Sequence, residues 1–409
     1  MKLKLHWRIL IAMGLGIVVA LTLGDKSLVF VPLGTIFMRL LKMVIVPLVL
    51  FSITSGVASL GDSKTLGRMG LKTFAYYFLT SILAILVGLI LTNLIKPGVG
   101  VLMNTRAESY DLSNLSESGG IVGILVRMIP TNPIQAMANG EMLSIIFWSI
   151  VFGFGITQLR GAPGKILTDF FNAGFEAMMK ITHGVIFLLP IGVFGLIIKA
   201  VANSGWDLFK AVGLYIVTIF TGLSIHLLVL LPLVFWFFTR MNPVKHYKAM
   251  ASAMATAFST SSSGATLPVT MDCVENNIGV SNKTTSFVLP LGATINMDGT
   301  ALYECAGVLF ISQVLGFDLS ITQQFVIVIT AFLASVGAAA VPSAGLVMIF
   351  IVLDAVGLGN HPEAAMIVGT MLAVDRPLDM YRTVVNITSD SIGAVVIATS
   401  EGEKDLYPK

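Results

Sequence analysis

A group of ionisable and amide side chains lies within an otherwise apolar segment, residues 364–399. Asp375, Asp379, Arg382, Asn386 and Asp390 follow one another at intervals of three or four residues. At about 100° per residue they share one helical face about 80° wide, opposite a face of Leu, Val, Ile and Ala. A charge at mid-membrane costs about 2.5 to 3.5 kcal/mol even on the mildest scale, so this face must turn toward a polar interior. We interpret it as one wall of a binding site; charges that pair internally and only hold helices together are the alternative.

A second polar group interrupts the apolar segment 284–314 at its centre. The sequence there is Asn296-Met297-Asp298-Gly299-Thr300. Glycine permits the helix to unwind, and unwound carbonyls together with the Asn296 and Asp298 side chains supply hard oxygen ligands for a small cation. Na⁺ fits better than Ca²⁺ or Mg²⁺, because one carboxylate per site is too little charge for tight divalent binding.

Two further segments place small and hydroxyl residues between short apolar halves, at residues 257–268 and 333–345. Each half is about 8 to 12 residues long, too short to cross a bilayer alone. Each pair is therefore predicted to enter the membrane and return as a re-entrant hairpin whose irregular tip lines a cavity. A flexible Ser/Gly kink within ordinary helices is the alternative for either tip alone. A hairpin segment followed by a membrane-spanning segment occurs twice in the sequence. This order predicts an inverted repeat whose two units meet at the substrate.

The composition indicates a polytopic membrane protein. The 409 residues are 56% hydrophobic and 11% charged, whereas soluble proteins average about 25% charged residues. The net charge of +3 is spread over short loops, so nothing suggests binding to nucleic acid. Two cysteines form no disulfide framework, and five histidines show no metal-binding spacing. We interpret His226, within an apolar run, as a satisfied core residue.

Six apolar runs long enough to span precede the first hairpin: 9–23, 28–60, 74–94, 142–159, 178–202 and 208–238. Positive charges alternate between the ends of these runs, which places the N-terminus in the cytoplasm. Residues 96–140 form the only long polar loop, which is expected outside.

Taken together, these segments resemble the dicarboxylate/amino acid:cation symporter family, which contains archaeal aspartate transporters and mammalian excitatory amino-acid transporters. The resembling motifs are Tyr76–Ser81, Ser261–Ser263 with Thr266-Leu267-Pro268, Asn296–Thr300, the tip from Ser335 to Gly345, and Asp379 to Asp390. The resemblance implies an all-α fold of eight transmembrane helices and two re-entrant hairpins. It also implies a homotrimer in the cell membrane, in contact with lipid and with both termini in the cytoplasm.

The resemblance also divides the chain. Residues 1–72 would hold scaffold helices 1 and 2, residues 73–95 transport-domain helix 3, residues 96–141 the extracellular loop and the start of helix 4, residues 142–202 scaffold helices 4 and 5, and residues 203–242 helix 6. Residues 243–281 would hold hairpin 1, residues 282–318 the broken helix 7, residues 319–358 hairpin 2, and residues 359–409 helix 8 and the tail. The transport domain is expected to move as an elevator against the trimeric scaffold.

The resemblance implies that Arg382 binds the side-chain carboxylate of the substrate and Asp379 its α-ammonium, which agrees with the chemistry of both groups. The other implied substrate contacts are Ser261, Ser263, Thr300, Val341, Gly345, Thr383 and Asn386. Implied sodium ligands are Gly292, Asn296, Asn386 and Asp390 at one site, Tyr77, Thr80, Ser81, Asn296 and Asp298 at a second, and Thr294, Met297, Ser335, Val336 and Ala338 at a third. Glu304 matches the acidic residue that mammalian-like members use for protons; a salt-bridged structural glutamate is the alternative.

These features predict a secondary active symporter, not an enzyme, that imports L-glutamate or L-aspartate with Na⁺ and with or without H⁺. The alternative within the family is a proton-coupled glutamate/aspartate symporter or a C4-dicarboxylate symporter, although a dicarboxylate would leave Asp379 without an ammonium partner. A channel would show a repeated filter or a ring of charges. An intramembrane aspartyl protease would take its two aspartates from separate helices, whereas Asp375 and Asp379 share one.

Overall fold

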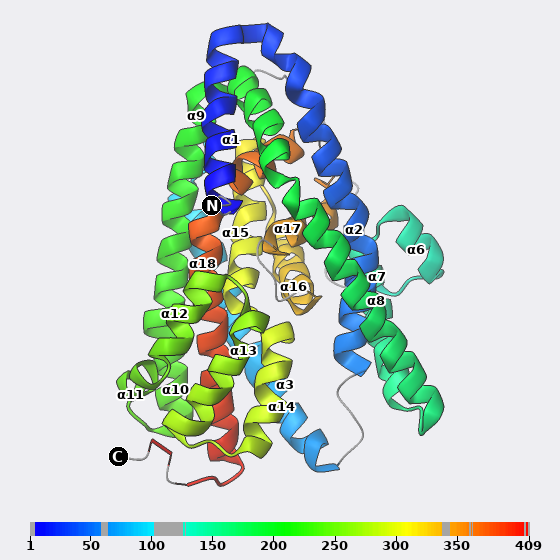
Figure 1. The fold of residues 1–409 in the computed structure, drawn as a ribbon, viewed down its shortest axis with the longest axis vertical. Coiled ribbons are helices and arrows are strands. Elements are labelled where there is room, and N and C mark those ends of the chain that lie inside the picture. Colours follow the sequence, from blue (N-terminus) through cyan, green and yellow to red (C-terminus); the bar gives the residue numbers. More distant parts are fainter. Residues whose placement is uncertain are drawn as a thin grey trace.

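Every regular element in the described part of the chain is helical (Figure 1). The computed structural model describes residues 5–58, 64–101, 126, 128–337, 344–359, 361, 363–404 and 406–407. The elements are α1 (Leu5–Leu23), η1 (Gly24–Phe30), α2 (Val31–Ala58), α3 (Lys64–Ile95), α6 (Pro133–Asn139), α7 (Met142–Thr157), α8 (Ala162–Phe187), α9 (Leu189–Ile225), η2 (His226–Leu230), α10 (Leu231–Thr239), α11 (Pro243–Ala249), α12 (Ala251–Thr260), α13 (Ser263–Asp272), η3 (Cys273–Ile278), α14 (Asn282–Ile295), α15 (Asp298–Val314), α16 (Ile321–Gly337), α17 (Ala344–Ala355) and α18 (Ala364–Ser400).

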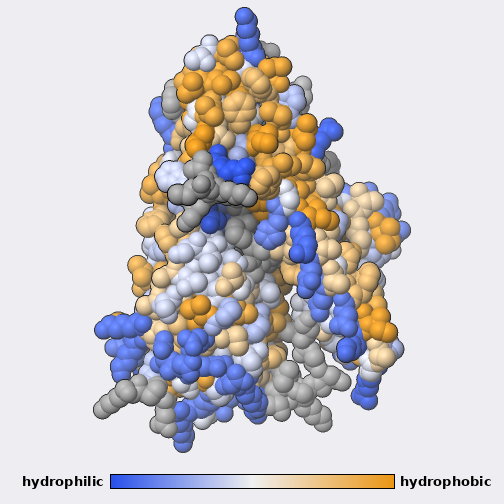
Figure 2. Space-filling model, in the orientation of Figure 1, coloured by the Kyte–Doolittle hydropathy of each residue, from blue (hydrophilic) through white to orange (hydrophobic). Residues whose placement is uncertain are grey.

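The helices are long and apolar, as a membrane protein requires. Among the described residues, four helical stretches are long and apolar enough to cross a bilayer, and a fifth arises if α8 and residues 189–202, bent by 52° at Leu188, count as one span. Pro190 follows this bend in the first turn of α9, where the missing proline N–H is tolerated. In Figure 2 apolar residues cover much of the upper part of the visible face, and hydrophilic residues gather at its lower end.

One group of helices surrounds α2, which packs on α7, α8 and α9, while α1 packs along α9. Small residues bring two of these backbones together: a Cβ added at Gly195 of α9 would lie 2.6 Å from the backbone nitrogen of Gly34 of α2. Such close contacts between small residues are typical of helix packing in membranes. Figure 1 shows α2, α7 and α8 together along one side of the molecule.

A second group surrounds α18, which packs against α9, α12, α14 and α15. Of the 37 residues of α18 most are buried, including Asp375, Arg382 and Asp390. This degree of burial explains why its polar side chains recur on one face, because each must find a partner on a neighbouring helix or within α18 itself. α15 is buried along almost all of its length and packs on α3, α17 and α18.

Two helix pairs occupy the predicted hairpin segments. α12 and α13 pack on each other and are joined by two residues, Ser261 with a left-handed φ of 52° and the extended Ser262. The Ser262 hydroxyl accepts a hydrogen bond from Ala265 N at 3.1 Å and so caps α13. α16 and α17 also pack on each other. Their connection, residues 338–343, lies outside the described residues, as do the predicted site residues Ala338 and Val341.

The predicted break in the helix near Asp298 is present, but its cause differs from the expectation. α14 ends at Ile295 and α15 begins at Asp298, and the non-helical residues are Asn296 (φ −97°, ψ 85°) and Met297 (φ −115°, ψ 60°). Gly299 itself lies in the first turn of α15. A Cβ there would be 2.7 Å from the backbone oxygen of Arg382, so glycine is needed for close approach to α18 and not for unwinding.

Candidate functional site

Arg382 and two aspartates of α18 form a buried ion-pair group, which we call the arginine cluster (Asp375, Asp379 and Arg382). The Arg382 Nη2 donates to Asp379 Oδ1 at 2.7 Å, and Nη1 to Asp375 Oδ1 at 3.3 Å. The three side chains are only 2% to 3% exposed. Spacings of three and seven residues place these groups one and two turns apart on one face, which is why a single helix can satisfy its own arginine.

Residues from other elements enclose the guanidinium. Its Cζ lies 4.3 Å from the centre of the Tyr303 ring of α15, a cation–π contact. Gly345, at the start of α17, is so close that an added Cβ would lie 3.1 Å from Arg382 Cζ and 3.2 Å from Thr300 Cγ2. The start of α17 therefore lies directly against Arg382 and Thr300, at a distance that favours glycine.

Asn386, one turn after Arg382, connects α18 to the start of α15. Its Oδ1 accepts a hydrogen bond from Gly299 N at 2.8 Å, and its Nδ2 donates to Thr300 Oγ1 at 3.3 Å. Thr383 instead donates to the backbone oxygen of Asp379 at 2.8 Å. One asparagine thus joins the first turn of α15, directly after the helix break, to α18 one turn beyond Arg382.

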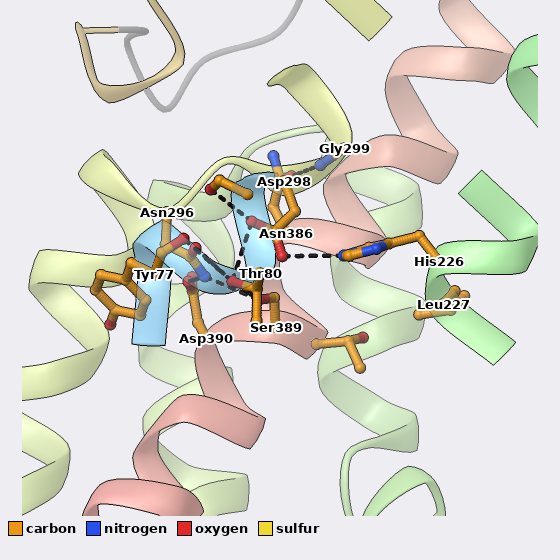
Figure 3. Close-up of polar contacts among 12 residues, drawn as sticks. Tyr77, Thr80, His226, Leu227, Asn296, Asp298, Gly299, Asn386, Ser389 and Asp390 are labelled. Carbon is orange, nitrogen blue, oxygen red and sulfur yellow. Dashed lines mark hydrogen bonds and ion pairs between the residues drawn. The ribbon is translucent and has the colours of Figure 1, made fainter. Parts of the chain in front are cut away.

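A second buried group, which we call the carboxylate–amide cluster, consists of Thr80, Ser81, Asn296, Asp298, Ser389 and Asp390; Figure 3 labels all of these except Ser81. Asn296 Nδ2 donates to Asp390 Oδ1 at 2.9 Å and to Ser389 Oγ at 3.0 Å. Thr80 Oγ1 lies 3.4 Å from Asn296 Oδ1. The cluster therefore joins α3 and α18 at the non-helical residues between α14 and α15.

Asp298 accepts hydrogen bonds from α3 on one carboxylate oxygen. Oδ1 accepts from Ser81 Oγ at 2.7 Å and from Thr80 Oγ1 at 3.3 Å. The motif Tyr76–Ser81 thus supplies two hydroxyl groups to the carboxylate of Asp298, which follows Ser81 by 217 positions in the sequence. Ser389, which sequence reasoning did not select, donates to Thr80 Oγ1 at 3.4 Å. It lies at about −40° from Asp375 around the axis of α18, next to the polar face, so the helical spacing could have identified it as a candidate site residue.

His226 is the residue that sequence reasoning missed. Its Nε2 lies 3.0 Å from Asp298 Oδ2, and both side chains are fully buried. Figure 3 shows His226 approaching Asp298 from the side opposite Asn296 and Asp390. It begins the π-helical turn η2, a type of helix defect that is frequent at functional sites. His226 is buried and hydrogen-bonded through Nε2, as expected of a core residue, although its Nδ1 has no hydrogen-bond partner among the described residues.

Tyr77 and Gly292 lie beside Asp390. The Tyr77 hydroxyl donates to the backbone oxygen of Val288 at 2.8 Å. A Cβ added at Gly292 would lie 2.6 Å from both Asp390 Oδ1 and the Tyr77 hydroxyl oxygen. Only glycine fits between these two oxygens, so the backbone of α14 comes close to the carboxylate.

The remaining predicted residues are brought together only in part. Ser261 and Ser263 are buried at the tip of the first hairpin, whose two helices contact α18, and the Ser261 hydroxyl has no hydrogen-bond partner among the described residues. The hydroxyls of Thr294 and Ser335 donate to carbonyls of their own helices, at 3.0 Å to Leu291 and 2.8 Å to Phe332. Thr294 and Val336 line one cavity of about 300 Å³. Met297, three residues after Thr294, is buried, but no described contact joins it to Ser335.

Glu304 is fully buried in α15, one turn after Thr300. Neither carboxylate oxygen has a hydrogen-bond partner among the described residues. The part of the chain that the structure describes thus contains no salt bridge for Glu304. A carboxyl group in such surroundings avoids the large penalty of a buried unpaired charge if it carries a proton.

The two clusters differ in what they offer a ligand. The arginine cluster contains a guanidinium fork that matches a carboxylate and an aspartate that can accept an ammonium group. The carboxylate–amide cluster contains two buried carboxylates, and no lysine or arginine among the described residues pairs with either. Its donor set of carboxylate, amide, hydroxyl and nearby carbonyl oxygens fits a small monovalent cation. No group of three or more His, Cys, Asp or Glu side chains that could hold a metal ion is present among the described residues.

Comparisons with known proteins agree with these two chemistries. Residues 5–400 match the sodium:dicarboxylate symporter family. The chain is 38% identical to excitatory amino acid transporter 3 of Mus musculus, over 97% of this chain and 86% of that protein. It is 36% identical to the proton/glutamate-aspartate symporter of Escherichia coli (strain K12), over 99% of this chain and 94% of that protein. It is 35% identical to the proton/sodium-glutamate symport protein of Geobacillus stearothermophilus, over 98% of this chain and 96% of that protein.

Proposed function

This chain belongs to the sodium:dicarboxylate symporter family, and we propose that it imports acidic amino acids, L-glutamate or L-aspartate, together with Na⁺. It is a membrane symporter and not an enzyme in the catalytic sense. The observation that carries the substrate proposal is the buried pair of Arg382 and Asp379, which holds a carboxylate receptor and an ammonium receptor 2.7 Å apart. An acidic amino acid presents both complementary groups.

Substrate binding would exchange an internal ion pair for two external ones. The side-chain carboxylate of the substrate binds the guanidinium of Arg382. The carboxylate of Asp379, released from Arg382, then accepts hydrogen bonds from the α-ammonium group. Asp375 remains as the second partner of Arg382 and keeps the fork oriented. Ser261, Ser263, Thr300, Thr383, Asn386 and Gly345, with Val341 at the second tip, complete the proposed substrate site.

We propose that Na⁺ binds at the carboxylate–amide cluster, where two buried carboxylates need a cation. Asn296, Asp390, Asn386 and Gly292 form one proposed site, and Tyr77, Thr80, Ser81, Asn296 and Asp298 form a second. A third would use Thr294, Met297, Ser335, Val336 and Ala338. Coupling follows because Asn386 bonds both Gly299 and Thr300, so an ion that orders the break at Asn296 also orders the substrate site, and each ligand raises the affinity for the other.

Glu304 is our candidate for a proton that accompanies the substrate. Its carboxyl group follows Tyr303, whose ring covers Arg382, and has no described hydrogen-bond partner. Proton binding at Glu304 would therefore be linked to substrate binding at the arginine cluster. Relatives named as proton-coupled symporters favour this role.

The architecture that we propose is a homotrimer in the cell membrane with eight transmembrane helices, two re-entrant hairpins and cytoplasmic termini. The helices around α2 would form the trimeric scaffold, and those around α18 the transport domain that moves as an elevator. Two observations support this architecture: α2 and α18 each have their own set of neighbours, with α9 packing on both, and the hairpin helices α12 and α13, at 10 residues each, are too short to span.

Counterflow in proteoliposomes tests the proposal. Purified protein is reconstituted with internal unlabelled aspartate, and uptake of labelled aspartate, glutamate, succinate and alanine is measured with Na⁺, H⁺ and K⁺ gradients imposed one at a time. Saturable, Na⁺-dependent exchange of aspartate or glutamate is the expected result. Exchange of succinate in preference to both would replace the amino-acid assignment with a C4-dicarboxylate, and exchange that needs only a proton gradient would remove sodium coupling.

A further inference from the structure

The chain beyond α18 turns back along the lower end of the molecule, where Figure 1 places the C-terminus near α11. We name residues 401–404 and 406–407 the tail strap. Although short and close to the end of the chain, it contacts α3, α11 and the junction of η3 with α14. Leu406 and Tyr407 pack against the hydrophobic core. The strap is therefore packed against the helices and forms part of the fold.

Two glutamates attach the strap to α3 and to the start of α14. Glu401 forms ion pairs with Arg68 and Lys72 in α3, the latter at 2.6 Å. The two carboxylate oxygens of Glu403 accept hydrogen bonds from Ser281, which is the N-cap of α14: Oε2 from Ser281 N at 2.8 Å and Oε1 from Ser281 Oγ at 2.6 Å. Thr284 Oγ1 also donates to Glu403 Oε1, at 2.6 Å.

Tyr407 contacts both roots of the first hairpin. The chain enters α12 from α11 and leaves α13 through η3. Tyr407 N donates to the backbone oxygen of Ile278, the last residue of η3, at 2.6 Å. Its hydroxyl lies 2.8 Å from Nδ1 of His246 in α11. One residue of the strap thus joins the segment before the hairpin to the segment after it.

His246 extends this connection to α18. Its ring is fully buried, and its Nε2 lies 2.9 Å from the Ser391 hydroxyl of α18. The Phe235 ring of α10 packs against it at 5.2 Å. Tyr407 adopts a left-handed φ of 61°, which is uncommon for a residue other than glycine and persists only where surrounding contacts hold it. The hydrogen bonds from both roots supply such contacts.

We propose that the tail strap locks both roots of hairpin α12–α13 to α18, so that loss of the strap loosens this hairpin from its roots to its tip. Among the described residues no strap contact reaches α16 or α17, so the second hairpin is not held in this way. The proposal rests on these contacts and does not depend on which substrate or ion is transported.

Amide hydrogen exchange of the full protein in nanodiscs, followed by mass spectrometry, tests the lock. One variant ends after Gly402, and two milder variants, Tyr407→Phe and Glu403→Gln, each remove one attachment. The truncation is expected to speed exchange about tenfold at both roots, residues 243–250 and 274–285, and at the tip, residues 261–265. Tyr407→Phe should act mainly on the first root and Glu403→Gln on the second. Amides of α2 and α7 should not change.

Tyr247→Phe is the matched control, because its hydroxyl donates from α11 to the Leu227 carbonyl of η2 and not to the strap. It should leave residues 274–285 at the wild-type rate. Unchanged exchange at both roots in every strap variant would overturn the proposal. Faster exchange at the roots with an unchanged tip would also overturn it, because the contacts would then be local. If the truncated chain does not fold, the two point variants decide by the same criteria.

Discussion

The two polar clusters along α18 satisfy their charges in opposite ways. In the arginine cluster, one helix supplies the cation and both anions, and the bonds run between residues three and seven positions apart. In the carboxylate–amide cluster the partners come from α3, η2, the α14–α15 junction and α18, and they are hydroxyl and amide groups together with the imidazole of His226. A self-paired cluster can exchange its partner for a ligand of either charge. A cluster of carboxylates among neutral groups can only gain a cation.

This difference explains how one helix can present two unlike candidate sites, one for an anionic group and one for a cation, about two turns apart. Arg382 and Asp390 are eight residues apart on one face, which is about 12 Å along the helix. Asn386 lies between them and bonds the start of α15. At the Arg382 level α18 supplies its own ion pairs, whereas at the Asp390 level other elements supply the partners, and the proposed preference for an anion or a cation follows from this difference.

The largest effect is expected from Arg382→Cys, which removes the cation of the arginine cluster. Loss of a buried charged hydrogen-bond donor should weaken aspartate binding by about 100-fold or more, and the space left could admit neutral amino acids. Counterflow with labelled aspartate and serine measures both effects. Arg376→Cys is the matched control, since Arg376 lies on the same helix and contacts Asp379 at 3.4 Å but is 27% exposed. Aspartate affinity equal to wild type in Arg382→Cys would refute the assignment.

Asp390→Asn tests the other cluster. The change removes one of the two buried carboxylates and should lower the apparent Na⁺ affinity by about 10- to 100-fold, while aspartate binding at saturating Na⁺ is largely kept. A sodium titration of aspartate uptake measures it. Asp272→Asn, at an exposed position in α13, is the control. If the sodium titration of Asp390→Asn overlays that of the control, this carboxylate is not an ion ligand, and the contrast between the clusters fails.

The sequence was sufficient for features that depend on local spacing. The polar face of α18 follows from the helical period, and the break before Asp298 follows from polar residues in an apolar segment. The structure brings Arg382, Asp379, Thr300 and Gly345 together, as the resemblance implied for the substrate site. The number of membrane spans, the trimer and the motion stay predictions.

Features that depend on distant pairing could not be found in this way. His226 has no polar neighbour within one helical turn on either side except Ser224, and its partner Asp298 is 72 positions away. The tail strap is equally hidden, because Glu403 and Tyr407 have ordinary types for a polar terminus, and their importance comes from Ser281, Ile278 and His246. The role of Gly299 was misassigned for the same reason: its tight contact is with Arg382 on another helix.

His226→Leu refines the description of the carboxylate–amide cluster. Because His226 holds Asp298 Oδ2, its loss should let the carboxylate reorient and weaken apparent Na⁺ affinity by about three- to tenfold, less than Asp390→Asn. His226→Gln keeps a donor and should recover part of the affinity, whereas a purely packing role would give no such rescue. His183→Gln, at an exposed position of α8, is the control. A titration in which the Leu variant matches the control would show that Asp298 needs no support from η2.

The smallest effect is expected beyond both clusters, at Glu403 of the tail strap. Burial opposes ionisation of this group, but hydrogen bonds from Ser281 and Thr284, with the nearby Lys283, outweigh it and hold the pKa of Glu403 below its usual range. A carboxyl group whose pKa is lower in the folded protein than in the unfolded chain stabilises the fold. This stabilisation is fully present above the pKa of the unfolded chain, about 4.3, and is lost as the pH falls through the pKa of the folded protein.

Glu403→Gln should therefore lower the Tm at pH 7 by about 1 to 2 °C. The difference from wild type should shrink toward zero as the pH falls through the pKa of Glu403 in the folded protein. The apparent Na⁺ affinity should not change, because the strap makes no described contact with the carboxylate–amide cluster. A Tm difference that persists unchanged at low pH would show that the side chain acts through packing and not through its charge.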